Sequence, residues 1–244
     1  CGEEGLDKSM DFFIRYYNTR PAVQMYLAED TAEEILSAKR DDQFVPIQEL
    51  QNLGKSGKYN GKAVSVDFLE FVNGASRPGS SPVLPVLGIK QDRVELLGTA
   101  YFQKYQLAGF LTLDQTRGYL ATKGTLKSGE LVVQGEDFGT VTLTVSKGSG
   151  KREVDFQGDV PIFRTVYQVT ADVSAISGET SSLGEEFYTA VEREVAQQLE
   201  KEMNQVLEQV LLEDQCDIFG FGNYLSQRYP KRWEALFLNW EEVM

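Results

Sequence analysis

The apolar positions from 182 to 214 recur at spacings of three and four residues. Such spacing places them on one face of a helix, so the pattern predicts one unbroken helix from Ser182 to Asp214. Ser182 and Glu185 stand at the spacing of a capping box, which marks its start. At 1.5 Å per residue this helix would be about 45 Å long. The apolar stripe consists of Leu183, Phe187, Val191, Val195, Leu199, Met203, Val206, Leu207, Val210 and Leu211.

The segment before this helix has the pattern of a β-sheet. From Val141 to Val145, valine and leucine alternate with threonine, which is typical of a half-buried strand. Pro161–Ile176 is predicted to be a long strand. Lys147–Lys151 contains two glycines and is predicted to be a hairpin turn, from which Arg152–Gln157 returns. Short turns favour antiparallel pairing, and we expect the long helix to cover this antiparallel sheet with its apolar stripe.

The middle of the chain has the pattern of a small α+β unit. Asn73–Pro82 is rich in turn-forming residues and is predicted to be a linker. A short helix, Thr112–Leu120, has Thr112 or Asp114 as its N-cap and ends at Lys123-Gly124. The strands predicted between linker and helix are Pro82–Ile89, Arg93–Gln103 and Tyr105–Leu113.

The first sixty residues contain too little sheet for a complete domain. Helix patterns cover Leu6–Tyr17, Ala32–Ala38 and Pro46–Leu53, and Ala22–Ala28 alternates like a strand. One strand and three helices cannot close a sheet, so we expect this region to belong to a larger domain. The whole chain is predicted to be an α+β protein of three consecutive domains: an incomplete N-terminal α/β domain (1–60), a small middle α+β domain (61–134) and a C-terminal domain of sheet plus long helix (135–244).

Composition excludes several classes of function. A net charge of −13 argues against nucleic acid, because phosphates require a basic surface. The absence of histidine removes the commonest general base and most zinc sites. Cys1 and Cys216 cannot form an all-cysteine zinc site or a disulfide framework. Lys55–Lys62 lacks the spacing of a phosphate loop. We therefore predict no enzymatic activity, no cofactor and no metal.

The acidic charge concentrates on the predicted long helix. Eight glutamates and Asp214, against Arg193 and Lys201, give this helix a net charge of −7. We interpret them as a solvated face, because the oxygen ligands of a calcium loop do not occur at the required spacing. The glutamates weighed as a cation site are Glu185, Glu186, Glu192 and Glu194.

An aromatic, glycine-rich tail follows the helix. It either packs in the core or forms a docking surface for a partner. Gly220 and Gly222 are interpreted as backbone turns rather than ligand contacts. Arg228, Lys231 and Arg232 form a basic cluster, which is either solvated or in contact with an acidic partner. The residues of the tail that have the spacing of a helix core are Trp233, Leu236, Phe237 and Trp240.

The same tail carries a family signature. Its residues are Asp217, Gly220, Gly222, Tyr224, Pro230, Trp233 and Trp240. In this order they resemble the closing signature of the Ger(x)C family, the C subunits of spore germinant receptors. Leu97–Phe102 with Leu107–Leu111 is similar to a middle segment of that family, and Phe12–Leu36 resembles its first-domain helix, strand and helix. The resemblance covers nearly the whole chain.

The resemblance implies three α/β-type domains in a row and a non-enzymatic, membrane-associated lipoprotein. Such a protein would work in nutrient sensing with two integral membrane subunits, A and B, on the outer face of the spore inner membrane. Family members carry their lipid-anchored cysteine well upstream, so we expect the anchor before this chain rather than at Cys1. The alternative expectation is a soluble cell-envelope protein that binds a small ligand. A cavity with convergent polar groups would favour that alternative.

Overall fold

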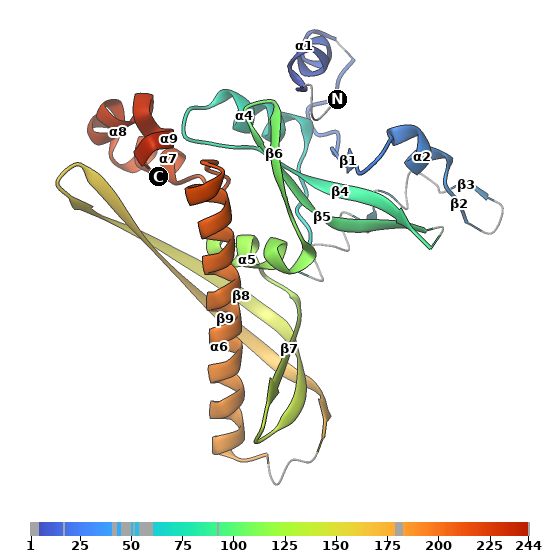
Figure 1. The fold of residues 1–244 in the computed structure, drawn as a ribbon, viewed down its shortest axis with the longest axis vertical. Coiled ribbons are helices and arrows are strands. Elements are labelled where there is room, and N and C mark those ends of the chain that lie inside the picture. Colours follow the sequence, from blue (N-terminus) through green and yellow to red (C-terminus); the bar gives the residue numbers. More distant parts are fainter. Residues whose placement is uncertain are drawn as a thin grey trace.

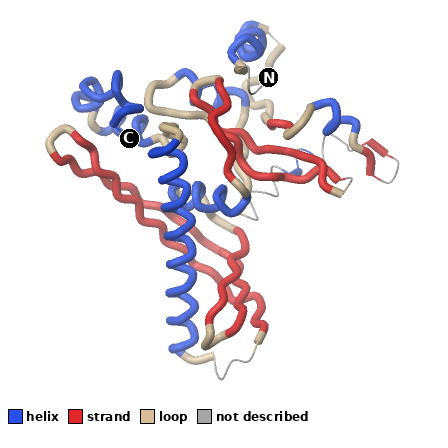
Figure 2. Tube along the Cα trace, in the orientation of Figure 1, coloured by secondary structure: helices blue, strands red, loops and turns tan. Residues whose placement is uncertain are grey.

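The structure is a computed structural model that describes residues 5–16, 18–40, 43–44, 50, 52–53, 61–91, 93–178 and 183–243. It is an α+β fold with mixed and antiparallel sheets, as the sequence predicts. Figure 1 shows the two larger sheets at different levels of the molecule, with one long helix running beside the lower of them. Figure 2 separates the helices, strands and loops. Within the described residues, no helix is long and apolar enough to cross a membrane.

The upper sheet has the order β1-β4-β5-β6. β1 pairs parallel with β4, whereas β4, β5 and β6 are antiparallel neighbours. The first strand of the chain therefore joins the sheet of the middle region. The N-terminal strand is shorter than predicted and begins only at Leu27. Between Ala22 and Tyr26 the structure records an isolated bridge, from Gln24 to Asp67. The bounds are β1 (Leu27–Ala28), β4 (Val83–Lys90), β5 (Arg93–Gln103) and β6 (Gln106–Leu111).

Short elements surround this sheet. Thr31 caps α2, and its side chain accepts the N–H of Glu34 at 3.2 Å. Asp67 and Glu70 form a capping box at the start of α4. The predicted Pro46–Leu53 helix and the Lys55–Lys62 loop lie largely outside the described residues, as does Cys1. The bounds are α1 (Asp7–Arg15), α2 (Ala32–Ser37), β2 (Lys39–Arg40), β3 (Gln43–Phe44) and α4 (Phe68–Ser76).

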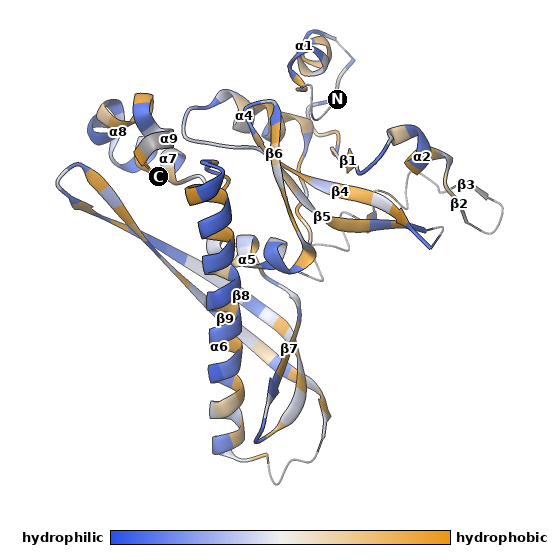
Figure 3. Ribbon diagram, in the orientation of Figure 1, coloured by the Kyte–Doolittle hydropathy of each residue, from blue (hydrophilic) through white to orange (hydrophobic). Residues whose placement is uncertain are grey.

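The lower sheet is antiparallel in the order β7-β8-β9 and is covered by α6. Its inward side chains, such as Leu131, Val141 and Leu143, meet Val191, Val195 and Leu199 of the helix in one buried cluster. Figure 3 shows hydrophilic and hydrophobic residues alternating along α6. The bounds are β7 (Gly129–Gly135), β8 (Gly139–Gln157), β9 (Val160–Ser177) and α6 (Glu185–Leu207).

The long helix differs from its prediction at both ends. It begins at Glu185 with Gly184 in the N-cap position, rather than at the predicted cap Ser182, which lies outside the described residues. Its final turn, η1 (Glu208–Glu213), is a π-helix that ends next to Asp214. A π turn inserts one extra residue and changes the direction of the side chains that follow.

The predicted hairpin turn at Lys147–Lys151 is wrong, because β8 continues through these residues after a register shift between Val145 and Lys147, and the chain turns at Gly158 and Asp159. Arg152–Gln157 therefore continues the same strand rather than returning. The glycines serve close packing instead of a turn. A Cβ on Gly148 would lie 2.0 Å from the carbonyl oxygen of Leu126, and one on Gly150 would lie 2.4 Å from the Cα of Gly124.

The predicted linker Asn73–Pro82 is wrong as well. Its first residues complete α4, which runs to Ser76. The remainder packs against the C-terminal region, where the N–H of Ser81 donates to the carbonyl of Asp217 at 2.8 Å. A Cβ on Gly79 would meet the ring of Trp233 at 2.4 Å. The turn-forming residues here allow two parts of the chain to approach closely.

α5 (Leu113–Lys123) joins the two sheets. Thr112 is its N-cap in a capping box with Gln115, and Gly124 ends it with a φ of 74°, as predicted. The helices after η1 are α7 (Phe221–Arg228), α8 (Pro230–Leu236), η2 (Phe237–Asn239) and α9 (Trp240–Val243). They share the largest buried cluster with the upper sheet, so this core unites residues from Leu6 to Trp240. The three domain boundaries drawn from the sequence stay a prediction.

Candidate functional site

The carboxylate of Asp217 is the centre of the C-terminal signature. The residue is 2% exposed. Its Oδ1 accepts the N–H groups of Gly220 at 2.7 Å and Phe221 at 3.0 Å, and its Oδ2 accepts that of Gly222 at 2.7 Å and the indole Nε1 of Trp240 at 3.3 Å. The first N–H groups of a helix have no partner within the helix. Asp217 therefore supplies both the hydrogen bonds and the negative charge that the start of α7 favours.

The two signature glycines explain the spacing of the motif. Gly220 precedes α7 with a φ of 75°, in the left-handed region that glycine adopts without strain. Gly222 touches the backbone of the segment before β4, since a Cβ there would lie 2.6 Å from the Cα of Gly79. One glycine allows the turn around Asp217 and the other allows close packing.

Arg152 reaches this loop from the middle of β8. Its Nη1 donates to the carbonyl of Gly220 at 3.4 Å and its Nη2 to that of Phe219 at 3.2 Å. The guanidinium lies 4.4 Å from the ring centroid of Phe221 and 5.8 Å from that of Tyr224, within the range of cation–π attraction. The hydroxyl of Tyr224 donates back to the carbonyl of Arg152 at 3.3 Å.

Burial shapes the ionisation of both charged groups. It raises the pKa of Asp217, while the hydrogen bonds from Gly222, Phe221 and Gly220 act in the opposite direction. It lowers the pKa of Arg152, and the negative charge of Asp217 opposes that shift. The negative charge of Asp217 thus offsets part of the free-energy cost of burying the guanidinium of Arg152.

The remaining signature residues pack around this centre. Pro230 stands at the first position of α8, where a missing N–H costs nothing. Trp233 packs edge-on against Trp240 with ring centroids 5.3 Å apart, and Trp240 is 4% exposed. Of the tail residues left open between core and docking surface, Leu236 and Trp240 are buried, whereas Phe237 is 38% exposed.

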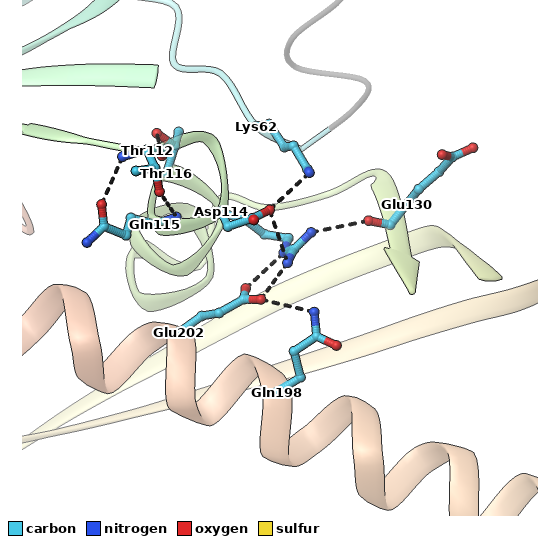
Figure 4. A network of polar contacts seen from close by, with 9 residues as sticks. Lys62, Thr112, Asp114, Gln115, Thr116, Glu130, Gln198 and Glu202 are labelled. Atoms are coloured by element: carbon cyan, nitrogen blue, oxygen red, sulfur yellow. Dashed lines mark hydrogen bonds and ion pairs between the residues drawn. The ribbon is translucent and has the colours of Figure 1, made fainter. Parts of the chain in front are cut away.

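A second polar centre, between α5 and α6, was not predicted. Arg117 and Glu202 form a paired contact in which Nε donates to Oε2 at 2.8 Å and Nη2 donates to Oε1. Their side chains are 7% and 12% exposed. Figure 4 shows Glu202 and Asp114 converging on the same guanidinium, with Lys62 3.0 Å from Asp114. Although burial lowers it, the pKa of Arg117 lies above its ordinary value because of Glu202.

This pair corrects one interpretation of the helix glutamates. The sequence predicts a solvated acidic face that includes Glu202, but this side chain is 12% exposed, pairs with Arg117 and accepts the amide of Gln198 at 3.0 Å. The helices meet so closely here that a Cβ on Gly118 would lie 2.5 Å from the carbonyl oxygen of Glu202. Gly118, one position after Arg117, is the feature of the sequence from which this close contact between helices could have been predicted.

A third polar group fixes the π turn. The hydroxyl of Tyr101 on β5 donates to the carboxylate of Asp214 and accepts the amide of Gln209 at 3.0 Å. Burial, followed by the bond to Asp214, raises the pKa of Tyr101. Gln115 of α5 donates to Gln209 at 2.7 Å. The end of the long helix is thereby tied to the upper sheet.

Two cavities accompany these centres. The larger, about 1330 Å³, is a groove between α6 and β9 that ends at Trp240 and Val243. The smaller, about 800 Å³, lies between the end of α5, β8 and the signature loop. Within the described residues, no three acidic or thiol side chains come together as ligands for a metal ion. The polar groups of the signature are bonded to one another, so the arrangement holds a fold together.

Two family models match this chain, one in each part of the sequence. The family model for the C-terminal region of spore germination B3 and GerAC-like proteins matches residues 97–244, and the model for the N-terminal domain of spore germination proteins matches residues 2–89. The crystal structure of the GerBC protein superimposes with a TM-score of 0.73, over 100% of this chain and 72% of that chain, at 16% identity. That likeness concerns the fold alone.

Two curated relatives come from Bacillus subtilis (strain 168). Spore germination protein YndF is 22% identical over 243 residues, which cover 98% of this chain and 59% of YndF. Spore germination protein KC is 22% identical over 264 residues, which cover 98% of this chain and 64% of that protein. This chain thus spans less than two thirds of their length. Since the first family model alone matches more than half of the chain, the protein belongs to the Ger(x)C family of spore germination proteins.

Proposed function

We propose that this protein is a non-enzymatic subunit of a spore germinant receptor. It acts in nutrient sensing with two integral membrane subunits, A and B, and a lipid anchor holds it to the outer face of the spore inner membrane. Membership of the Ger(x)C family supports the receptor role. The lipid anchor, the two subunits and the location rest on the resemblance of the signature.

The observation that supports a structural rather than catalytic role is the state of the signature itself. Asp217 is buried, and its two carboxylate oxygens accept hydrogen bonds from four donors. A general base or nucleophile must reach a substrate. A carboxylate in this position stabilises the start of a helix and leaves the outer surface of α7 and α8 to present side chains to a partner.

The alternative, a soluble cell-envelope protein that binds a small ligand, has one observation in its favour. The smaller cavity is lined by several cationic side chains. A receptor subunit can also hold a ligand, so the two functions are compatible. The receptor role is therefore tested by assembly.

The deciding experiment is affinity capture from spore inner-membrane extracts with the tagged, lipidated protein. Recovery of the A and B subunits by mass spectrometry is the expected result. A variant with Arg228, Lys231 and Arg232 replaced by glutamine tests the basic cluster as the contact, and Lys201→Gln on the long helix controls for lost charge. Absence of both subunits from the captured material would rule out the receptor assignment.

A further inference from the structure

The smaller cavity differs in charge from the rest of the protein. It lies where the end of α5, the middle of β8 and the residues before β4 meet. Its lining has four cations and one carboxylate, in a chain of net charge −13. The groove beside α6 is instead lined by three glutamates and one arginine. The charged residues of the smaller cavity are Glu70, Lys123, Lys127, Lys151 and Arg152.

Three of these five charges already have partners. Lys151 forms an ion pair with Glu153 at 2.5 Å. Arg152 is held by the carbonyls of Phe219 and Gly220. The carboxylate of Glu70 accepts the N–H of Asp67 at 3.2 Å in the capping box of α4. Lys123 and Lys127 remain, and within the described residues neither lies in an ion pair.

Lys123 is positioned by an aromatic residue rather than by an acid. Its Nζ donates to the hydroxyl of Tyr119 at 3.0 Å and lies 5.4 Å from the centroid of that ring. Tyr119 is 1% exposed, so the phenol is a fixed support. An ammonium has three donors. Among the residues that the structure describes, the bond to Tyr119 is the hydrogen bond recorded for this ammonium, and Lys123 is an exposed residue that lines the cavity.

Backbone contact brings a second cation close to Lys123. Gly124 ends α5 directly against β8, since a Cβ on Gly150 would lie 2.4 Å from the Cα of Gly124. Lys123 stands next to Gly124 and Arg152 two positions after Gly150, and both residues line the cavity. Tyr119 raises the pKa of Lys123, and the charge of Arg152 acts against that shift. Glu70 of the same cavity also raises the pKa of Lys123, but one carboxylate among four cations leaves the cavity with a net positive charge, which a bound anion would offset.

We propose that this cavity binds a small anion through a carboxylate or phosphate group, with the ammonium of Lys123 as the principal contact and Lys127 as a second cation. Buried side chains of Phe71, Val83 and Ile218 line the same cavity and suit a short apolar part of the ligand. This site is independent of receptor assembly, because it rests on the cavity alone.

The test is isothermal titration calorimetry of the purified protein with inorganic phosphate in one series and acetate in another, at constant ionic strength set with chloride. We expect millimolar or tighter binding of at least one anion. Lys123→Gln removes a charge-assisted hydrogen bond, so its affinity should fall about tenfold or more. Lys123→Arg should retain binding. Lys201→Gln, which removes the same charge from the exposed face of α6, should bind like the unaltered protein.

The outcomes separate the sources of the ligand group. Heat from phosphate alone assigns the site to phosphate, and heat from acetate alone assigns it to carboxylates. Far-UV circular dichroism checks that each variant is folded. The proposal is overturned if neither anion binds, or if Lys123→Gln and Lys201→Gln bind with equal affinity. In either case Lys123 would only complement the dipole at the end of α5.

Discussion

Buried charges in this protein are surrounded by groups of complementary polarity. Asp217 receives N–H donors from the start of α7 and from Trp240. The guanidinium of Arg152 donates to two backbone carbonyls and lies over the face of the Phe221 ring. Both buried charges have hydrogen bonds, although within the described residues the buried Nε of Arg152 has no partner. The cost of a substitution then depends on which partners lose their bonds.

Asp217→Asn tests the structural role of the buried carboxylate most directly. The amide replaces one carboxylate oxygen, so its NH₂ faces N–H donors, and at least one buried donor loses its acceptor. We expect the free energy of unfolding to fall by about 3 kcal/mol. Urea denaturation followed by circular dichroism measures it. Asp172→Asn, at an exposed position on β9, is the control and should change stability by less than about 0.5 kcal/mol. Equal stability of the two variants would contradict the structural role of Asp217.

Among the secondary-structure elements, local patterns predicted most and tertiary contacts decided the rest. The stripe of the long helix is a periodic signal within one segment. Its first residue, Leu183, is 56% exposed, contrary to the prediction, whereas the buried members are Phe187, Val191, Val195, Leu199, Val206 and Val210. The glycines at 148 and 150 could be predicted only as turn formers, because the chain segments that approach them lie far away in sequence. The π turn after Leu207 has the same origin, since Tyr101 and Gln115 hold its side chains.

The packing of α5 against α6 includes one buried ion pair, between Arg117 and Glu202. In Glu202→Gln the guanidinium of Arg117 keeps its burial and loses its main negative partner. Breaking such a pair costs about 3–5 kcal/mol, although Asp114, 3.5 Å away, moderates the loss. Glu200→Gln, two positions earlier on the exposed face, is the matched control and should be nearly neutral. Chemical denaturation of both variants compares them. If Glu202→Gln were as stable as Glu200→Gln, the pair would contribute nothing.

For the molecule as a whole, the sequence supplied only the C-terminal part of the candidate site, and the role of those residues stays a prediction. The signature residues from Asp217 to Trp240 do come together, as a set predicted from one segment. Arg152 and Lys123 come from β8 and α5, and no local pattern links them to the tail. The cavity that they line exists only after the sheets and helices have packed. Fold class could therefore be predicted from periodicity, whereas the partners of the signature required the three-dimensional structure.

The two large cores are predicted to unfold together. β8 and β9 contribute Leu143 and Val145 to the core beneath α6, and Val154 and Phe163 to the core beside α7. If either core unfolded, the apolar side chains that one half of the β8–β9 hairpin contributes to it would be exposed to solvent. Differential scanning calorimetry should therefore give a single transition in which the calorimetric and van't Hoff enthalpies agree. Two separate transitions would show that the upper and lower parts are independent.

The continuous hairpin also sets a length. A strand of 19 residues such as β8, at about 3.3 Å per residue, extends roughly 60 Å. Along that distance it carries the lower sheet at one end and supports Tyr229 through Phe156 at the other. The β8–β9 ladder has register shifts between Thr142 and Leu143 and between Val145 and Lys147, and from Lys147 to the turn its pairing is continuous, so the hairpin sets a fixed spacing within the molecule. It fixes how far the C-terminal helices stand from the far end of α6, and any partner that contacts both ends must match this span.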